Sequence, residues 1–175
     1  CDVISEKPLT TDMDKCREIL QAEAETGRRV TVTFNCRFMP YVVKVKELLS
    51  EGAVGNIQHV SLQWMLDRSH GADYFRRWHR KMENSGGLLV HKATHHFDMV
   101  NWWIDDEPDL IQAYQDLRFY GPNRKERGTR CLDCNYKHSC EFYYDITKNA
   151  FQNEFYHAAE QADGYIRDQC VFGED

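Results

Sequence analysis

The pattern of apolar and polar positions at the start of the chain predicts a strand, a helix and a second strand. Residues 3–5 close a short apolar run, and residues 28–35 form a β-branched run typical of a strand. Between them, a threonine at position 10 or 11 can cap a helix that runs to about residue 26, and Gly27 can end it. Strand–helix–strand is one unit of a parallel sheet, so this part predicts an α/β fold.

The pattern that follows predicts a second domain with its own sheet. Pro40 can start a helix that runs to about Ser50. Residues 55–66 form a long segment in which alternating side chains suggest a strand with one covered face, and residues 109–120 predict another strand. We therefore place residues 1–36 in one domain and residues 37–175 in another.

A pair of glycines, Gly86 and Gly87, opens a predicted helix that runs to about Ile104. At about 100° per residue, one arc of this helix is apolar and is expected to pack on the sheet. The opposite arc faces water or a cleft. The apolar arc contains Leu89, Ala93, Phe97, Val100 and Ile104, and the opposite arc contains His91, His95, Asp98 and Trp102.

This polar arc has more than one interpretation. A histidine on a helix most often faces water, but two histidines and a carboxylate in one row, beside paired glycines, favour a ligand site. A metal held by His91 and His95 is the less favoured alternative. The metalloprotease pattern needs Glu after the first histidine, and this chain has Lys92 there.

Lys7 stands where the first strand ends, within the tripeptide Glu6-Lys7-Pro8. The carboxyl ends of parallel strands are where α/β sheets bind ligands. An ammonium group at such a point can stabilise the developing charge on a substrate hydroxyl, and a histidine can accept its proton. Lys7 and the histidine helix together predict chemistry on an alcohol.

Four segments in this order resemble the family of glucose–fructose oxidoreductase and inositol 2-dehydrogenase (Gfo/Idh/MocA). They are EKPLTTD, VTVTFNCRFMP, EGAVGNIQHVSLQW and SGGLLVHKATHHFDMVNWW, within residues 2–120. The resemblance implies the end of a Rossmann domain followed by an incomplete C-terminal domain, an α/β (α+β) fold with a mostly antiparallel open sheet packed by helices. It also implies hydride transfer between NAD or NADP and a secondary alcohol of a sugar or cyclitol.

The resemblance assigns roles to individual residues. His95 matches the general base, and Lys7 matches the residue that contacts substrate and nicotinamide. His91 falls where many members have Asp, and it is expected to bind substrate or to tune His95. Asp98 matches an acidic residue that follows the histidine, and it is expected to bind substrate or to orient that histidine. The residues expected to approach the cofactor are Glu6, Lys7, Pro8, Arg37, Trp78 and Arg80.

The chain departs from the family pattern in its glycine-rich loop. The G-x-G-x-x-G segment that cradles the pyrophosphate does not occur in the sequence. The chain also begins without Met, and we expect a fragment that lacks most of the Rossmann domain. The activity is therefore predicted for the parent protein, and little NAD binding is expected from this polypeptide.

Composition limits the remaining classes of function. The chain carries 22 basic and 28 acidic side chains, a net charge of −6, which argues against nonspecific nucleic-acid binding. No apolar run approaches the ~18 residues of a membrane helix. The resemblance implies a small-molecule substrate and a homo-oligomer.

Seven cysteines, odd in number and widely spaced, favour a reducing compartment, and we expect a cytoplasmic protein. Cys131, Cys134 and Cys140 have the spacing C-x2-C-x5-C, in a predicted insertion of about residues 121–145. Three thiolates can hold a structural zinc ion if His138, His157 or Cys170 is the fourth ligand. An iron–sulfur cluster and reduced thiols remain alternatives.

Two other functions compete with the dehydrogenase. One is an NAD-dependent glycosidase of the same fold, which uses hydride transfer transiently. The other is a noncatalytic, metal-stabilised binding domain, suggested by the cysteine cluster and the aromatic-rich tail.

Overall fold

The structure is a computed structural model that describes residues 1–174, and its contacts divide these residues into two compact units. The first unit holds residues 1–64 and 85–113, and the second holds residues 65–84 and those from 114 onward. The domain boundary predicted after residue 36 lies inside the first unit.

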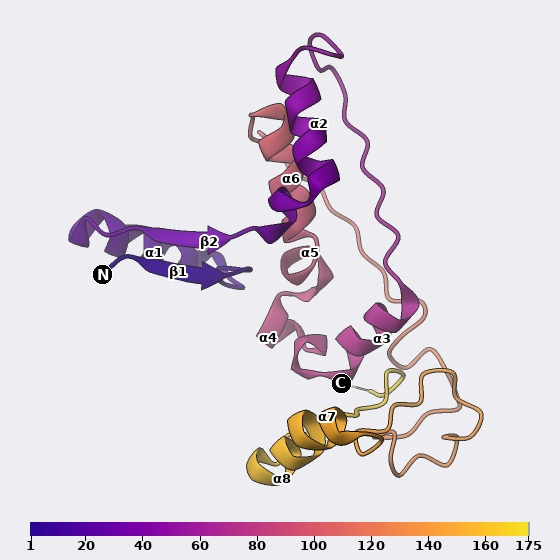
Figure 1. The fold of residues 1–175 in the computed structure, drawn as a ribbon. Coiled ribbons are helices and arrows are strands. Elements are labelled where there is room, and N and C mark those ends of the chain that lie inside the picture. Colours follow the sequence, from indigo (N-terminus) through magenta and orange to yellow (C-terminus); the bar gives the residue numbers. More distant parts are fainter. Residues whose placement is uncertain (175) are drawn as a thin grey trace. The chain divides into compact units, whose positions relative to one another are not determined.

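The first unit begins with the predicted strand, helix and strand (Figure 1). They are β1 (Val3–Glu6), α1 (Met13–Thr26) and β2 (Val30–Thr33). The strands pair in parallel, with Val3 opposite Val30. Asp12, not a threonine, caps α1, because its carboxylate accepts the Lys15 N–H at 2.8 Å.

The rest of the first unit is helical. It contains the 3-10 helix η1 (Asn35–Phe38), α2 (Pro40–Ser50), α5 (Gly87–His91) and α6 (Thr94–Ile104). Helices α2 and α6 lie side by side (Figure 1), and Val42 and Met99 are fully buried. The indole of Trp103 donates to the Val42 carbonyl at 3.0 Å, which fixes the two helices against each other.

The predicted antiparallel sheet is wrong. Within residues 1–174 the only sheet is the two-stranded parallel pair of β1 and β2. Segments 55–66 and 109–120 contain neither a strand nor a helix. Alternation of apolar side chains reports which residues share a face, but a strand also needs a neighbouring backbone to pair with.

The helix predicted from the paired glycines is divided into two. α5 ends at His91 and α6 begins at Thr94. At the break, the amides of Lys92 and Ala93 both donate to the Leu88 carbonyl at 2.9 Å. The break shifts the faces of the second helix: Phe97, predicted to pack inward, is 48% exposed, and Met99 is buried instead.

The second unit combines short helices with long irregular segments. Its helices are α3 (Arg68–Arg76), η2 (Trp78–Arg80) and α4 (Met82–Ser85), which leads back to the first unit, then α7 (Ala150–Gln152), the π-helix η3 (Asn153–Ala158) and α8 (Ala159–Asp163). Its core consists of Ala72, Phe142, Cys170, Val171 and Phe172. Within residues 1–174, no helix combines the length and apolar character needed to cross a membrane.

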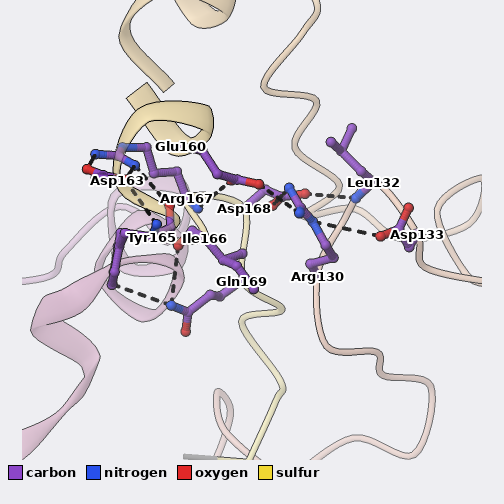
Figure 2. A network of polar contacts seen from close by, with 10 residues as sticks. All are labelled: Arg130, Leu132, Asp133, Glu160, Asp163, Tyr165, Ile166, Arg167, Asp168 and Gln169. Carbon is purple, nitrogen blue, oxygen red and sulfur yellow. Dashed lines mark hydrogen bonds and ion pairs between the residues drawn. The ribbon is translucent and has the colours of Figure 1, made fainter. Parts of the chain in front are cut away.

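A buried polar network joins two parts of the second unit (Figure 2). The Arg130 guanidinium contacts the carboxylates of Glu160 at 2.8 Å and Asp168 at 2.6 Å. The fully buried Asp168 also accepts the Leu132 N–H at 2.8 Å. Because a buried carboxylate is costly unless it is paired, these contacts hold the chain around Arg130 against residues near 168.

We expect Gly86→Ala to destabilise the protein more than Gly27→Ala. Both glycines have φ near +65°, a conformation that costs an alanine about 1 kcal/mol. A Cβ at Gly86 would also lie 2.8 Å from the Val90 Cβ, whereas a Cβ at Gly27 meets nothing within 4 Å. The free energy of unfolding should fall by about 2–3 kcal/mol for Gly86→Ala. Urea denaturation measures both variants, and equal losses would contradict the steric argument.

Candidate active site

Lys7 directly follows β1, and its side chain reaches the end of α5. The ammonium Nζ donates to the carbonyl oxygen of His91 at 2.8 Å. An ammonium has three N–H donors, so two donors remain after this bond. Burial lowers the pKa of Lys7, although the carboxylate of Glu6 and the thiol of Cys36 raise it.

His95 lies in the first turn of α6 and is half-buried. Burial lowers its pKa, and the positive charge of Lys7 lowers it further, whereas Asp98 raises it. The ring makes an edge-to-face contact with Phe34, with centroids 6.2 Å apart. Its Nδ1 is enclosed without a hydrogen-bond partner.

Arg37 and Asp98 form a bidentate ion pair. Arg37 lies on η1, and its Nε and Nη2 donate to the two Asp98 oxygens at 2.7 and 2.5 Å. The Asp98 side chain is 8% exposed and that of Arg37 is 36% exposed. The Arg37 guanidinium also lies over the Trp102 ring, 5.6 Å from its centroid. The carboxylate raises the pKa of Arg37 through this pair.

The structure therefore brings four of the predicted site residues into one unit with linked charges: Lys7, His95, Asp98 and Arg37. The backbone of His91 takes part through its carbonyl. Glu6 is exposed at the end of β1, and Pro8 follows Lys7 through a cis peptide bond.

Trp78 and Arg80 belong to the second unit, and their described contacts are internal to it. Arg80 is 8% exposed, and its guanidinium donates to the carbonyls of Cys170 at 3.0 Å and Gly173 at 2.9 Å. The Trp78 carbonyl accepts from the Asn84 side chain at 3.0 Å. Their role toward a cofactor stays a prediction.

Two further residues of the site, Phe34 and Cys36, were not predicted from the sequence. Phe34 follows β2 and packs on His95, and Cys36 lies within electrostatic range of Lys7. Burial raises the pKa of the Cys36 thiol, which opposes its ionisation. Nothing in the local pattern marks these residues, except that both precede Arg37 on the segment leading out of β2.

The predicted zinc site is not preformed. No three His, Cys, Asp or Glu side chains in the described part of the chain are arranged to hold a metal ion, so neither Cys131, Cys134 and Cys140 nor the pair of His91 and His95 forms a ready cluster. All seven cysteines, which lie within residues 1–174, are free thiols.

The arrangement around Lys7 and His95 suits proton transfer at an oxygen. A histidine whose pKa is lowered is neutral at neutral pH and can accept a proton. A nearby ammonium with spare donors can stabilise negative charge on oxygen. Asp98, held by Arg37, adds a fixed negative charge on the same helix as the histidine.

Comparisons with known proteins find one family across much of the chain. The C-terminal α/β domain of an oxidoreductase family, GFO_IDH_MocA_C, matches residues 46–150. "Putative oxidoreductase YteT" of Bacillus subtilis (strain 168) is 39% identical over 99% of this chain and 44% of its own length. An inositol 2-dehydrogenase of Rhizobium meliloti (strain 1021) is 27% identical over 63% of this chain and 32% of its own length.

The match to a solved structure covers only part of each chain. A crystal structure of a "putative myo-inositol dehydrogenase" of Sinorhizobium meliloti 1021 has a TM-score of 0.45 and 24% identity, covering 61% of this chain and 30% of that one. The chain thus spans less than half the length of these relatives.

We expect Asp98→Asn to lower the pKa of His95. The Asp98 carboxylate favours the charged imidazolium, so its removal favours the neutral ring. NMR titration of the His95 Cε1–H in the intact protein measures this change. Asp14→Asn, on the exposed face of α1, is the control and should leave the titration unchanged. An unchanged or raised His95 pKa in Asp98→Asn would show that Asp98 does not act on the ring.

Proposed function

The chain belongs to the Gfo/Idh/MocA oxidoreductase family, and we propose that the intact protein transfers hydride between a nicotinamide cofactor and a secondary alcohol of a sugar or cyclitol. The observation that carries the proposal is the hydrogen bond from the Lys7 ammonium to the His91 carbonyl at 2.8 Å, which holds the ammonium four residues before His95. Relatives named inositol 2-dehydrogenase support a polyol substrate.

A nicotinamide cofactor, NAD or NADP, would supply or accept the hydride when bound. Lys7 fits a place beside it, because two of its N–H donors remain after the bond to His91. The guanidinium groups of Arg37 and Arg80 donate to partners within the chain. The fit to the cofactor therefore rests on Lys7 and on the segment from Glu6 to Pro8.

His95 acts as the general base in alcohol oxidation. Its Nε2 accepts the hydroxyl proton, because Nδ1 is enclosed and the lowered pKa keeps the ring neutral. Lys7 donates to the same oxygen and stabilises the charge that develops as the proton leaves. In the reverse direction, the protonated His95 returns the proton to the carbonyl oxygen.

The assembly of the intact protein is part of the same proposal. A homo-oligomer follows from the family resemblance, and light scattering after size-exclusion chromatography measures it. The free state of all seven cysteines supports a reducing compartment, as in the cytoplasm.

We expect Lys7→Ala and His95→Ala each to lower kcat for oxidation of myo-inositol by about 10²–10⁴-fold in the intact protein. Reduced-cofactor absorbance measures turnover, and fluorescence quenching measures cofactor affinity. Lys44→Ala is the matched control, because Lys44 is exposed and pairs with Glu47 on α2. Near-normal turnover in His95→Ala would refute its role as base. If no polyol turns over in the unmodified protein, the substrate class is wrong.

We expect the pH profile of alcohol oxidation to have an acid limb below pH 6.5, the ordinary pKa of histidine. The base is neutral only above its pKa, and burial and Lys7 lower that pKa, so activity persists to lower pH and is lost as pH falls through it. The Lys7 pKa is also lowered from 10.5, so an alkaline limb should appear below pH 10.5. Lys7→Arg should move this limb upward, because arginine keeps its charge. An acid limb above pH 6.5 would contradict this assignment.

A further inference from the structure

The second unit contains a long segment that has little regular structure to hold it. Residues 121–149 form no helix and no strand, and their one ladder contact is an isolated bridge between Arg130 and Gln169. Irregular segments of more than about 12–15 residues within a compact unit are uncommon, and a binding site is one usual reason for them.

Four cysteines of this unit line one small cavity. Cys131, Cys134 and Cys140 come from the irregular segment, and Cys170 comes from the C-terminal part of the chain. The cavity volume is about 20 Å³, and a single water-sized sphere needs about 10–15 Å³. The cavity therefore has room for one small particle.

The backbone fixes the cysteines from the two segments next to each other. The amide of Cys131 donates to the Asp168 carbonyl at 2.8 Å, and that of Cys170 donates to the Thr129 carbonyl at 3.0 Å. The ion pairs of Arg130 with Glu160 and Asp168 secure the same junction (Figure 2). The fold thus places Cys170 beside the start of the C-x2-C segment.

A backbone amide also points at one of the sulfur atoms. The Tyr136 N–H donates to the Cys134 Sγ at 3.4 Å. Cys134 N–H bonds the Cys131 carbonyl at 3.1 Å, which closes a turn between the two cysteines. These two contacts fix the local conformation of the segment that carries Cys131 and Cys134.

We propose that Cys131, Cys134, Cys140 and Cys170 close on one Zn²⁺ as a structural tetrathiolate site. The four sulfurs are not in ligating positions as the structure stands, so the ion draws them together to the usual Zn–S distance of about 2.3 Å. Binding releases one proton from each thiol and leaves a complex of net charge −2. Arg130 and Lys137 line the same cavity and offset that charge.

This site does not depend on the dehydrogenase proposal. Four protein ligands leave no open position for substrate or water, so the ion stabilises and does not catalyse. Its effect is to fix the irregular segment against the C-terminal part of the same unit. The selection of Cys170 over His138 and His157 as fourth ligand follows from the cavity, since neither histidine lines it.

The test begins with the intact protein purified under reducing, anaerobic conditions. Elemental analysis should find one zinc per chain in the unmodified protein and in Cys16→Ser, whose cysteine lies on α1 in the other unit. Cys134→Ser should lose the metal or release it to a chelator at least about tenfold faster. Absence of zinc together with equal thermal stability with and without added Zn²⁺ would overturn the proposal, as would stoichiometric iron or a native disulfide among these cysteines.

Cobalt substitution tests the ligand set even where a variant is less stable. Co²⁺ in the unmodified protein should show the visible bands of a tetrahedral site and sulfur-to-cobalt charge-transfer absorption. Cys170→Ser should remove about a quarter of the charge-transfer intensity, because one of four thiolates is lost. His138→Ala and His157→Ala should leave the spectrum unchanged. An unchanged spectrum in Cys170→Ser would overturn the four-cysteine assignment.

Discussion

The hydrogen bond from the Lys7 ammonium to the His91 carbonyl is the contact on which the candidate active site depends. It joins two points 84 positions apart in the sequence, the end of β1 and the end of α5. The last carbonyls of a helix have no partner within the helix, and its C-terminal end favours a cation. A hydrogen bond from a charged donor contributes about 1.5–3 kcal/mol. This bond therefore both satisfies the end of α5 and holds the ammonium near the start of α6, where His95 lies.

The protonation state of His95 results from opposed effects. Lys7 and Asp98 act on the ring with opposite sign, and Arg37 pairs with the Asp98 carboxylate. Because the two charges oppose each other, burial, the largest effect, decides the direction and lowers the pKa. Burial therefore favours the neutral His95 ring, and Lys7 is not the sole cause of the lowered pKa. The ion pair of Arg37 and Asp98 permits a carboxylate next to the base without leaving an unpaired buried charge.

The sequence predicted the parts of the structure whose causes are local. The strand–helix–strand start was accessible because β-branched runs, a polar cap and Gly27 act over a few residues. Lys7 and His95 were accessible through the resemblance. The pair of Arg37 and Asp98 was not, because partners 61 positions apart leave no local signal. The break before Thr94 has neither proline nor glycine to mark it. The antiparallel sheet, which the resemblance implied, is wrong, and the strand patterns of residues 55–66 and 109–120 could not reveal whether a pairing partner exists.

Arginine in the second unit shows why residue type alone does not reveal a role. Arg76 donates to the Phe142 carbonyl at 2.6 Å and lies 4.6 Å from the centroid of the Tyr144 ring. The Arg80 guanidinium likewise donates hydrogen bonds to the carbonyls of Cys170 and Gly173. The carbonyls of an irregular backbone lack the N–H donors that a strand or helix would provide. A buried guanidinium, which has five N–H donors, can supply them. A guanidinium binds phosphate in other proteins. The role of Arg80 is therefore read from its hydrogen-bond partners, the carbonyls of Cys170 and Gly173, and not from its place in the sequence near Trp78.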